Sequence, residues 1–161
     1  MTQEQLYEYL EQLASSHVLV NHVPNSKNAG DKHFFRGELE EFYMDLRNRV
    51  NFPAVVAESF EVQFYDGKKV RESSFIIAAD YRESKDWDGI VSALRLCERI
   101  GDEFIRRIGY DDENGDLCGN IDFVSAVPIL NEQRLYAGMR YTFTDEQDFD
   151  EEPNKDMWKD L

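Results

Sequence analysis

Apolar residues recur at three- and four-residue steps between positions 87 and 108, which places them on one face of a helix. The stripe comprises Trp87, Ile90, Val91, Leu94, Cys97, Ile100, Phe104, Ile105 and Ile108. Asp86 precedes it as a candidate N-cap, and Gly109 follows it where a left-handed C-cap residue belongs. The sequence therefore predicts one long amphipathic helix over residues 86–108, whose apolar face must pack against other elements.

Strand patterns lie on both sides of this helix. Before it, a strand opening at Phe52 is separated from a return strand by Asp66-Gly67, a pair that favours a tight type I′ hairpin. The apolar run 75–79 does not alternate, which predicts a central strand covered on both faces by helices. After it, residues 121–129 and 135–143 alternate between apolar and polar residues, and the odd positions of the last strand are expected to face the core.

Proline and helical periodicity give further local expectations. Pro128 indicates an edge strand or a bulge in the 121–129 segment. Helical spacing predicts N-terminal helices over residues 3–14 and 34–50, and residues 18–20 have the composition of a short strand. We therefore expect a single α+β domain over residues 1–145, with a mostly antiparallel sheet of four to five strands packed by helix 86–108 and the N-terminal helices.

The charge distribution limits the classes of partner. The chain carries a formal net charge of −15, which disfavours binding to nucleic-acid phosphates and to anionic membranes. From Asp145 onward there are eight acids and two lysines, so residues 146–161 are expected to form an acidic, flexible tail. The sequence has no run of apolar residues long enough to span a bilayer and no secretory signal pattern, which predicts a cytoplasmic location.

The histidines, cysteines and acidic residues do not occur at the spacings of known metal-binding or catalytic motifs. The histidines His17, His22 and His33 match no zinc motif, and we expect the first to end a helix and the others to lie in a loop. Cys97 lies on the helical stripe as a packing residue, and Cys118 lies in a loop. The acidic run after Tyr110 lacks the ligands of a calcium loop at its first and twelfth positions. We therefore expect no enzymatic activity, metal or cofactor.

The order of elements resembles the tail terminator, or tail-completion, proteins of tailed bacteriophages. The resemblance covers about residues 52–145. It rests on the strand Phe52-Pro53-Ala54-Val55-Val56, the hairpin, the strand 75–79, the helix 87–108, the Gly109-Tyr110 junction with its acidic loop, and the closing strand 135–143. It implies a virion subunit that forms a ring, typically six-fold, which caps the tail tube and joins it to the head. The implied partners are copies of itself, a tail tube protein and a head-completion protein, in the virion or the host cytoplasm.

The resemblance also assigns candidate surfaces. An acidic loop lining the ring channel would repel DNA and let it slide; its members are Asp111, Asp112, Glu113 and Asp116. Neutralising these four is expected to impair DNA passage without unfolding the ring. Aromatic residues are candidates for the interfaces between subunits; they are Phe34, Phe35, Trp87, Phe149 and Trp158. For Trp87 the simpler interpretation is a core residue that covers the start of the helix, and an interface residue is the alternative.

Two other functions are compatible with the sequence. One is an acidic inhibitor that mimics DNA, with spaced carboxylates imitating phosphates in the site of a host nucleic-acid enzyme. Such a mimic would bind a basic protein in a steeply salt-dependent way and would not need to form rings. The other is a phage head–tail adaptor of a different kind built on the same fold.

Overall fold

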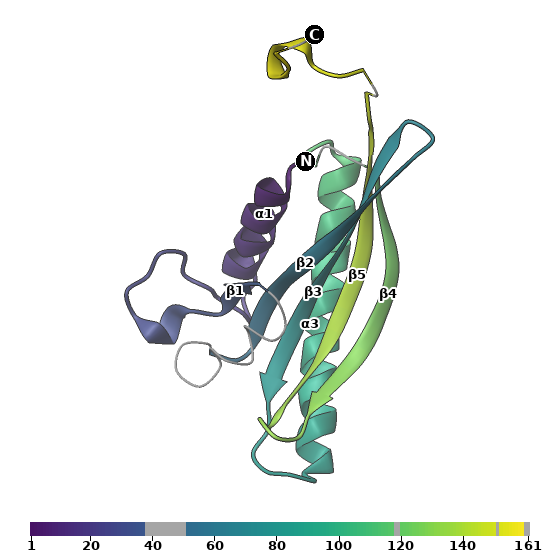
Figure 1. Ribbon diagram of the computed structural model, residues 1–161. Coiled ribbons are helices and arrows are strands. Elements are labelled where there is room, and N and C mark those ends of the chain that lie inside the picture. Colours follow the sequence, from purple (N-terminus) through teal and green to yellow (C-terminus); the bar gives the residue numbers. More distant parts are fainter. Residues whose placement is uncertain (38–50, 118–119, 151, 160–161) are drawn as a thin grey trace.

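A computed structural model describes residues 1–37, 51–117, 120–150 and 152–159. It has a five-stranded mixed sheet in the order β1-β2-β3-β5-β4, and helices α1 and α3 pack against one face (Figure 1). The predicted single α+β domain is confirmed. The elements are α1 (Gln3–Ser16), η1 (Ala29–Asp31), β1 (Phe34–Arg36), β2 (Ala54–Tyr65), β3 (Lys68–Asp80), α3 (Trp87–Glu113), β4 (Asn120–Asn131), β5 (Tyr136–Asp148) and η2 (Lys155–Met157).

The long helix begins as predicted and ends later. Asp86 caps it by accepting a hydrogen bond from the Gly89 N–H at 3.0 Å. The predicted end at Gly109 is wrong, because α3 continues to Glu113. A glycine inside a helix costs only about 1 kcal/mol relative to alanine, which packing readily offsets. Here the extra turn is held by Asp111, whose carboxylate accepts hydrogen bonds from two side chains of the domain.

The Asp66-Gly67 hairpin is confirmed, with positive φ angles of 51° and 68°. Two N-terminal predictions fail. Residues 18–20 form a turn in which the His17 carbonyl accepts hydrogen bonds, and not a strand. The helix predicted from residue 34 is replaced at its start by β1, which pairs in parallel with Val55–Ala57 of β2; the remainder of that prediction, residues 38–50, lies outside the described residues.

The main core fills the space between the sheet and the two helices. Alternate residues of β3 and β5, including Phe75, Ile77, Tyr141 and Phe143, meet the buried face of α3 there. Contact is close enough that a Cβ on Gly101 would lie 2.0 Å from the Tyr141 ring. The opposite face carries a smaller buried cluster: Phe35, Ala54, Val56, Ile76, Ala78 and Tyr136. The expectation of helices on both faces is therefore not met by the two described helices, which share one face.

Strand β5 extends beyond the predicted start of the tail. Its last residues, Thr144–Asp148, pair with Glu72–Lys68 of β3, so the boundary at residue 145 is wrong. The bases of β3 explain the extension: Lys68 lies 2.7 Å from an Asp148 oxygen, and the Arg71 Nη1 lies 3.2 Å from Asp145 Oδ2. Arg71 and Asp145 are 3% and 0% exposed. Burial raises the pKa of Asp145, and the charge of Arg71 opposes this shift.

Candidate self-assembly surface

Strand β4 forms one edge of the sheet. It pairs along its whole length with β5 on one side, and no described strand pairs with its other side. All residues from Asp122 to Pro128 are exposed. The ladder shifts register between Phe123 and Ser125, and Pro128 lies opposite Met139, so the predicted edge position and irregularity are both confirmed. An edge strand presents backbone donors and acceptors that another strand can bind.

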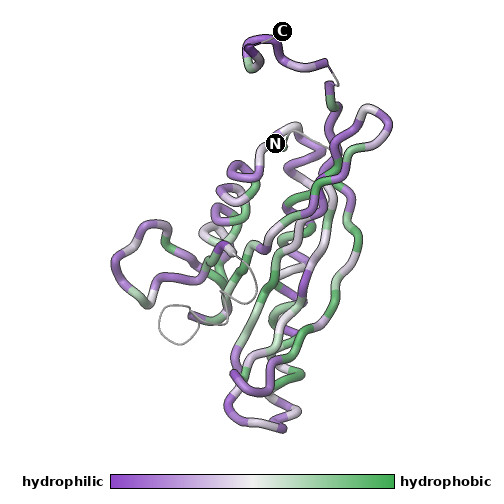
Figure 2. The backbone as a smooth tube through the Cα atoms, in the orientation of Figure 1, coloured by the Kyte–Doolittle hydropathy of each residue, from purple (hydrophilic) through white to green (hydrophobic). Residues whose placement is uncertain are grey.

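The side chains of β4 are unusually apolar for such an edge. Four large apolar residues are between 41 and 57% exposed: Phe123, Val124, Val127 and Leu130. Asp122 is the one charged residue among the twelve of this strand, in a chain of net charge −15. Figure 2 shows the apolar stretch along the outer strand of the sheet. Edge strands of monomeric proteins usually carry charges that prevent pairing, and β4 has almost none.

A second open edge lies on the other side of the sheet. Strand β1 covers β2 only at Val55–Ala57, and the ladder of β2 with β3 shifts register before Phe60. From Ser59 to Tyr65 no described strand pairs with the outer edge of β2, while the Glu58 carbonyl accepts a hydrogen bond from the Tyr7 hydroxyl of α1 at 3.1 Å. This segment also exposes large side chains, namely Phe60, Phe64 and Tyr65. Among the described strands, β4 and the outer half of β2 are thus two different edges with no strand paired to them, on opposite sides of one sheet.

The candidate acidic loop is largely not a loop. Asp111, Asp112 and Glu113 belong to the last turn of α3, and only Asp116 follows the helix. Asp111 is buried: it accepts from the Tyr9 hydroxyl at 2.8 Å and from Arg107 Nε at 2.8 Å to each carboxylate oxygen. Burial and this hydrogen bond raise the pKa of Tyr9. Asp111 therefore joins α1 to α3 and does not face solvent, which corrects its assignment to a channel lining.

The other members of that set differ in exposure. Asp112 is half-buried and accepts a hydrogen bond from the Ile121 N–H at 3.3 Å, which connects the end of α3 to β4. Glu113 and Asp116 are exposed. The acidic surface at this end of the helix is therefore smaller than the sequence predicts.

The five candidate interface aromatics separate into two groups. Phe34 and Phe35 are buried within the domain, one in each core cluster, so their side chains are not offered to a partner. Trp87, Phe149 and Trp158 are exposed, and the interpretation of Trp87 as a core residue is wrong because 61% of it is accessible. Trp87 stands at the first position of α3, one turn before the first buried residue of the stripe.

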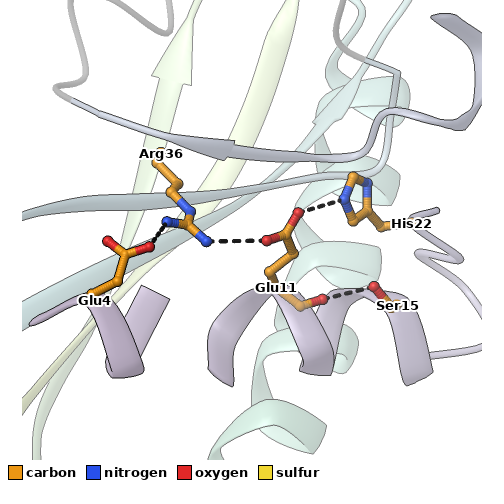
Figure 3. Close-up of polar contacts among 5 residues, drawn as sticks. All are labelled: Glu4, Glu11, Ser15, His22 and Arg36. Carbon is orange, nitrogen blue, oxygen red and sulfur yellow. Dashed lines mark hydrogen bonds and ion pairs between the residues drawn. The ribbon is translucent and has the colours of Figure 1, made fainter. Parts of the chain in front are cut away.

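A polar network joins α1, β1 and the loop between them (Figure 3). Arg36 bridges Glu4 at 2.6 Å and Glu11 at 3.1 Å, and the other oxygen of Glu11 lies 3.1 Å from His22 Nε2. Because His22 Nδ1 accepts from the His33 N–H, its Nε2 carries the proton donated to Glu11. His22 lies in a loop, as predicted, but its side chain is buried.

No described residues form a group of three or more His, Cys, Asp or Glu side chains that could hold a metal ion. Cys97 is buried against β5, and burial raises the pKa of its thiol to about 12, so it is a poor nucleophile. Cys118 lies outside the described residues. His17 follows α1 as predicted, but burial lowers its pKa, which disfavours the imidazolium at this helix end.

No protein-family model matches the sequence, and a search of curated proteins finds no match. Within the part of the chain that is described, no helix is long and apolar enough to cross a membrane. Pro128 indicated the edge position of β4, but the exposure of its apolar side chains was not predicted, because their alternation was interpreted as one face of a strand. The signal for this exposure is the near absence of charge along the strand.

Proposed function

We propose that this protein is a virion assembly subunit that associates with copies of itself through its open sheet edges and forms a ring capping a phage tail tube. The observation that carries the proposal is the exposed, nearly uncharged edge of β4 in a strongly acidic chain. Like-charged copies repel each other unless the contact avoids charge, and β4 is a long surface that does so. Pairing of backbone groups across two copies would add directional hydrogen bonds.

The two open edges are chemically different, which favours a head-to-tail arrangement. If β4 of one subunit pairs with Ser59–Tyr65 of the next, each subunit uses both edges and every interface is the same. Repetition of such a heterologous contact generates either a closed ring or an open filament. A ring matches the expectation from the tail terminator resemblance, in which the partners are a tail tube protein and a head-completion protein.

The acidic charge has a role in this proposal. A ring through which DNA passes benefits from a channel that repels phosphates. Glu113 and Asp116 are the members of the predicted acidic set that are exposed, and we assign them to the channel side in place of the full set of four. Replacing both with glutamine and asparagine respectively should slow DNA passage in assembled particles while leaving ring formation intact.

The proposal is tested by the solution mass of the protein over a concentration series, measured by light scattering after size exclusion. The wild-type protein should show a mass that rises with concentration toward a fixed oligomer. The substitutions Val124→Lys and Val127→Lys each place a charge on the open edge strand β4, and the resulting proteins should remain monomeric. Val91→Lys is the matched control, because Val91 is similarly exposed but lies on α3.

Two results would contradict the proposal. One is self-association that the β4 lysines do not change, which would place the contact elsewhere. The other is a monomer at every concentration that binds a basic nucleic-acid enzyme with steep salt dependence, which is the behaviour of a DNA mimic.

A further inference from the structure

A pocket lies between α3 and the end of α1 with the turn that follows it. Its volume is about 470 Å³, within the range of roughly 300–1,000 Å³ of pockets that hold small molecules. The apolar residues that line it are Leu13, Val18, Leu19 and Phe104. These side chains offer an apolar surface against which the body of a ligand can be buried.

The backbone at this end of α1 already uses several of its acceptors within the domain. The Leu13 carbonyl accepts a hydrogen bond from the His17 N–H at 3.0 Å, and the Ala14 carbonyl accepts one from the His22 N–H at 3.2 Å. The His17 carbonyl accepts from the Asn21 N–H at 2.8 Å in the following turn. These three carbonyls, which would otherwise favour a cation at the end of a helix, are therefore satisfied.

The side chain of His17 adds a hydrogen-bond donor to the pocket. Its Nδ1 accepts from the Leu19 N–H at 3.2 Å, and burial lowers its pKa from 6.5, so the ring is neutral at pH 7 and carries its proton on Nε2. The ring packs against Phe104, with centroids 5.7 Å apart. No described residue accepts a hydrogen bond from Nε2. This N–H is therefore available to an acceptor in the pocket.

Two arginines of α3 give the pocket positive charge. Arg99 is exposed and has no ion-pair partner within 4.0 Å among the described residues. Arg107 binds Asp111 through Nε, and its two Nη groups make no hydrogen bond within the described part of the chain. Of the described lining residues only Glu103 is acidic, and it is paired with Arg106. The groups left open to a ligand are thus chiefly donors, although the chain as a whole has a net charge of −15.

We propose that this pocket binds a small amphipathic carboxylate, whose charged group accepts hydrogen bonds from Arg99 and His17 while its apolar body covers Phe104. A guanidinium presents paired N–H donors that match the two oxygens of a carboxylate. A cationic ligand would be repelled by the arginines, and a neutral apolar one would leave the donors without partners. The site is separate from the proposed self-association, because none of its described lining residues belongs to β2 or β4.

Isothermal titration calorimetry of the full-length protein tests this with octanoate, octanol and octylamine, which share one chain length. Octanoate should bind at a single saturable site, and Ser16→Trp should abolish this binding, because Ser16 is exposed at the last position of α1 and a tryptophan there fills the pocket. Arg99→Gln should weaken binding about tenfold through loss of a charged hydrogen bond. Arg95→Gln is the matched control, since Arg95 is an exposed arginine of α3 that is not among the lining residues.

Three results would overturn the inference. They are the absence of saturable octanoate binding, octanoate binding that Ser16→Trp leaves unchanged, and octanol or octylamine binding as tightly as octanoate at the site that Ser16→Trp removes. An equal loss from Arg99→Gln and Arg95→Gln would show that net charge and not this pocket determines binding. Val127→Lys should bind octanoate like the wild type, so the pocket and the self-association through β4 are tested separately.

Discussion

Replacing Arg71 with methionine should destabilise the domain in a pH-dependent way. In the native protein the guanidinium is buried with Asp145, donates to the Met1 carbonyl at 2.8 Å and lies over the Phe60 ring. Methionine fills similar space without charge and leaves Asp145 buried with no cation 3.2 Å away. The carboxyl then protonates in the folded state, because an isolated buried charge costs more than neutralisation.

The magnitude follows from the cost of that protonation. An unfolded aspartate has a pKa near its ordinary 3.8, so holding the carboxyl neutral in the folded protein costs at most about 4 kcal/mol at pH 7 and at most about 2 kcal/mol at pH 5. The sign follows from linkage. Because the carboxyl has a higher pKa in the folded state than in the unfolded state, the folded protein binds more protons. This group therefore favours folding at low pH, and that contribution is lost as the pH rises.

Urea denaturation at pH 7 and pH 5 measures both values. We expect the difference in unfolding free energy between wild type and Arg71→Met to lie below the bound at pH 7, because burial already raises the pKa of Asp145 in the wild type, and to be smaller at pH 5. The double variant Arg71→Met with Asp145→Leu should recover most of the loss, because buried ion pairs are often replaced by apolar pairs at little cost. A difference that does not change with pH, or a double variant as unstable as the single one, would refute this reasoning.

Three further expectations concern the core. Gly101→Ala should cost about 1–3 kcal/mol of unfolding free energy, because its Cβ would overlap the buried Tyr141 ring; an unchanged urea midpoint would contradict this packing. Tyr9→Phe should cost about 1–2 kcal/mol by removing a donor from buried Asp111, measured in the same way, and a neutral effect would place that hydrogen bond in doubt. Cys97 should resist a thiol reagent in the folded protein and react after denaturation, as followed by peptide mapping; rapid native labelling would contradict its burial.

The sequence predicted the elements whose signals are local. The Asp66-Gly67 turn needs two positive φ angles, which these residue types adopt readily, and Asp86 caps a helix through its own side chain. The alternation of residues 135–143 identified the core face of β5, where Ala137, Tyr141 and Phe143 are buried. Each of these features depends on neighbours within a few residues.

The errors occurred where distant residues decide the outcome. Asp111 and Asp145 belong to acidic runs that suggest a loop and a tail, but Arg107 and Arg71 bind them and extend α3 and β5. Phe34 lies in a stretch with helical periodicity, yet its backbone pairs in parallel with Val55. The residues near Phe34 in the sequence give no indication of this pairing.

The candidate site was harder to predict than the fold. Strand β4 is exposed because it is the last strand in the sheet, and the order of the strands cannot be deduced from the sequence. Trp158 is exposed and can reach a partner, whereas Phe35, proposed on the same chemical grounds, is buried. Composition therefore identifies residues able to form an interface, and the tertiary structure decides which of them reach the surface.

Negative-stain electron microscopy of the purified protein, at a concentration where light scattering shows the largest mass, is the decisive experiment on ring formation. We expect closed rings of uniform subunit number with a central channel, absent from Val124→Lys and Val127→Lys and present in Val91→Lys. Single particles the size of one subunit at every concentration, or closed two-fold dimers in place of rings, would rule out assembly into a ring.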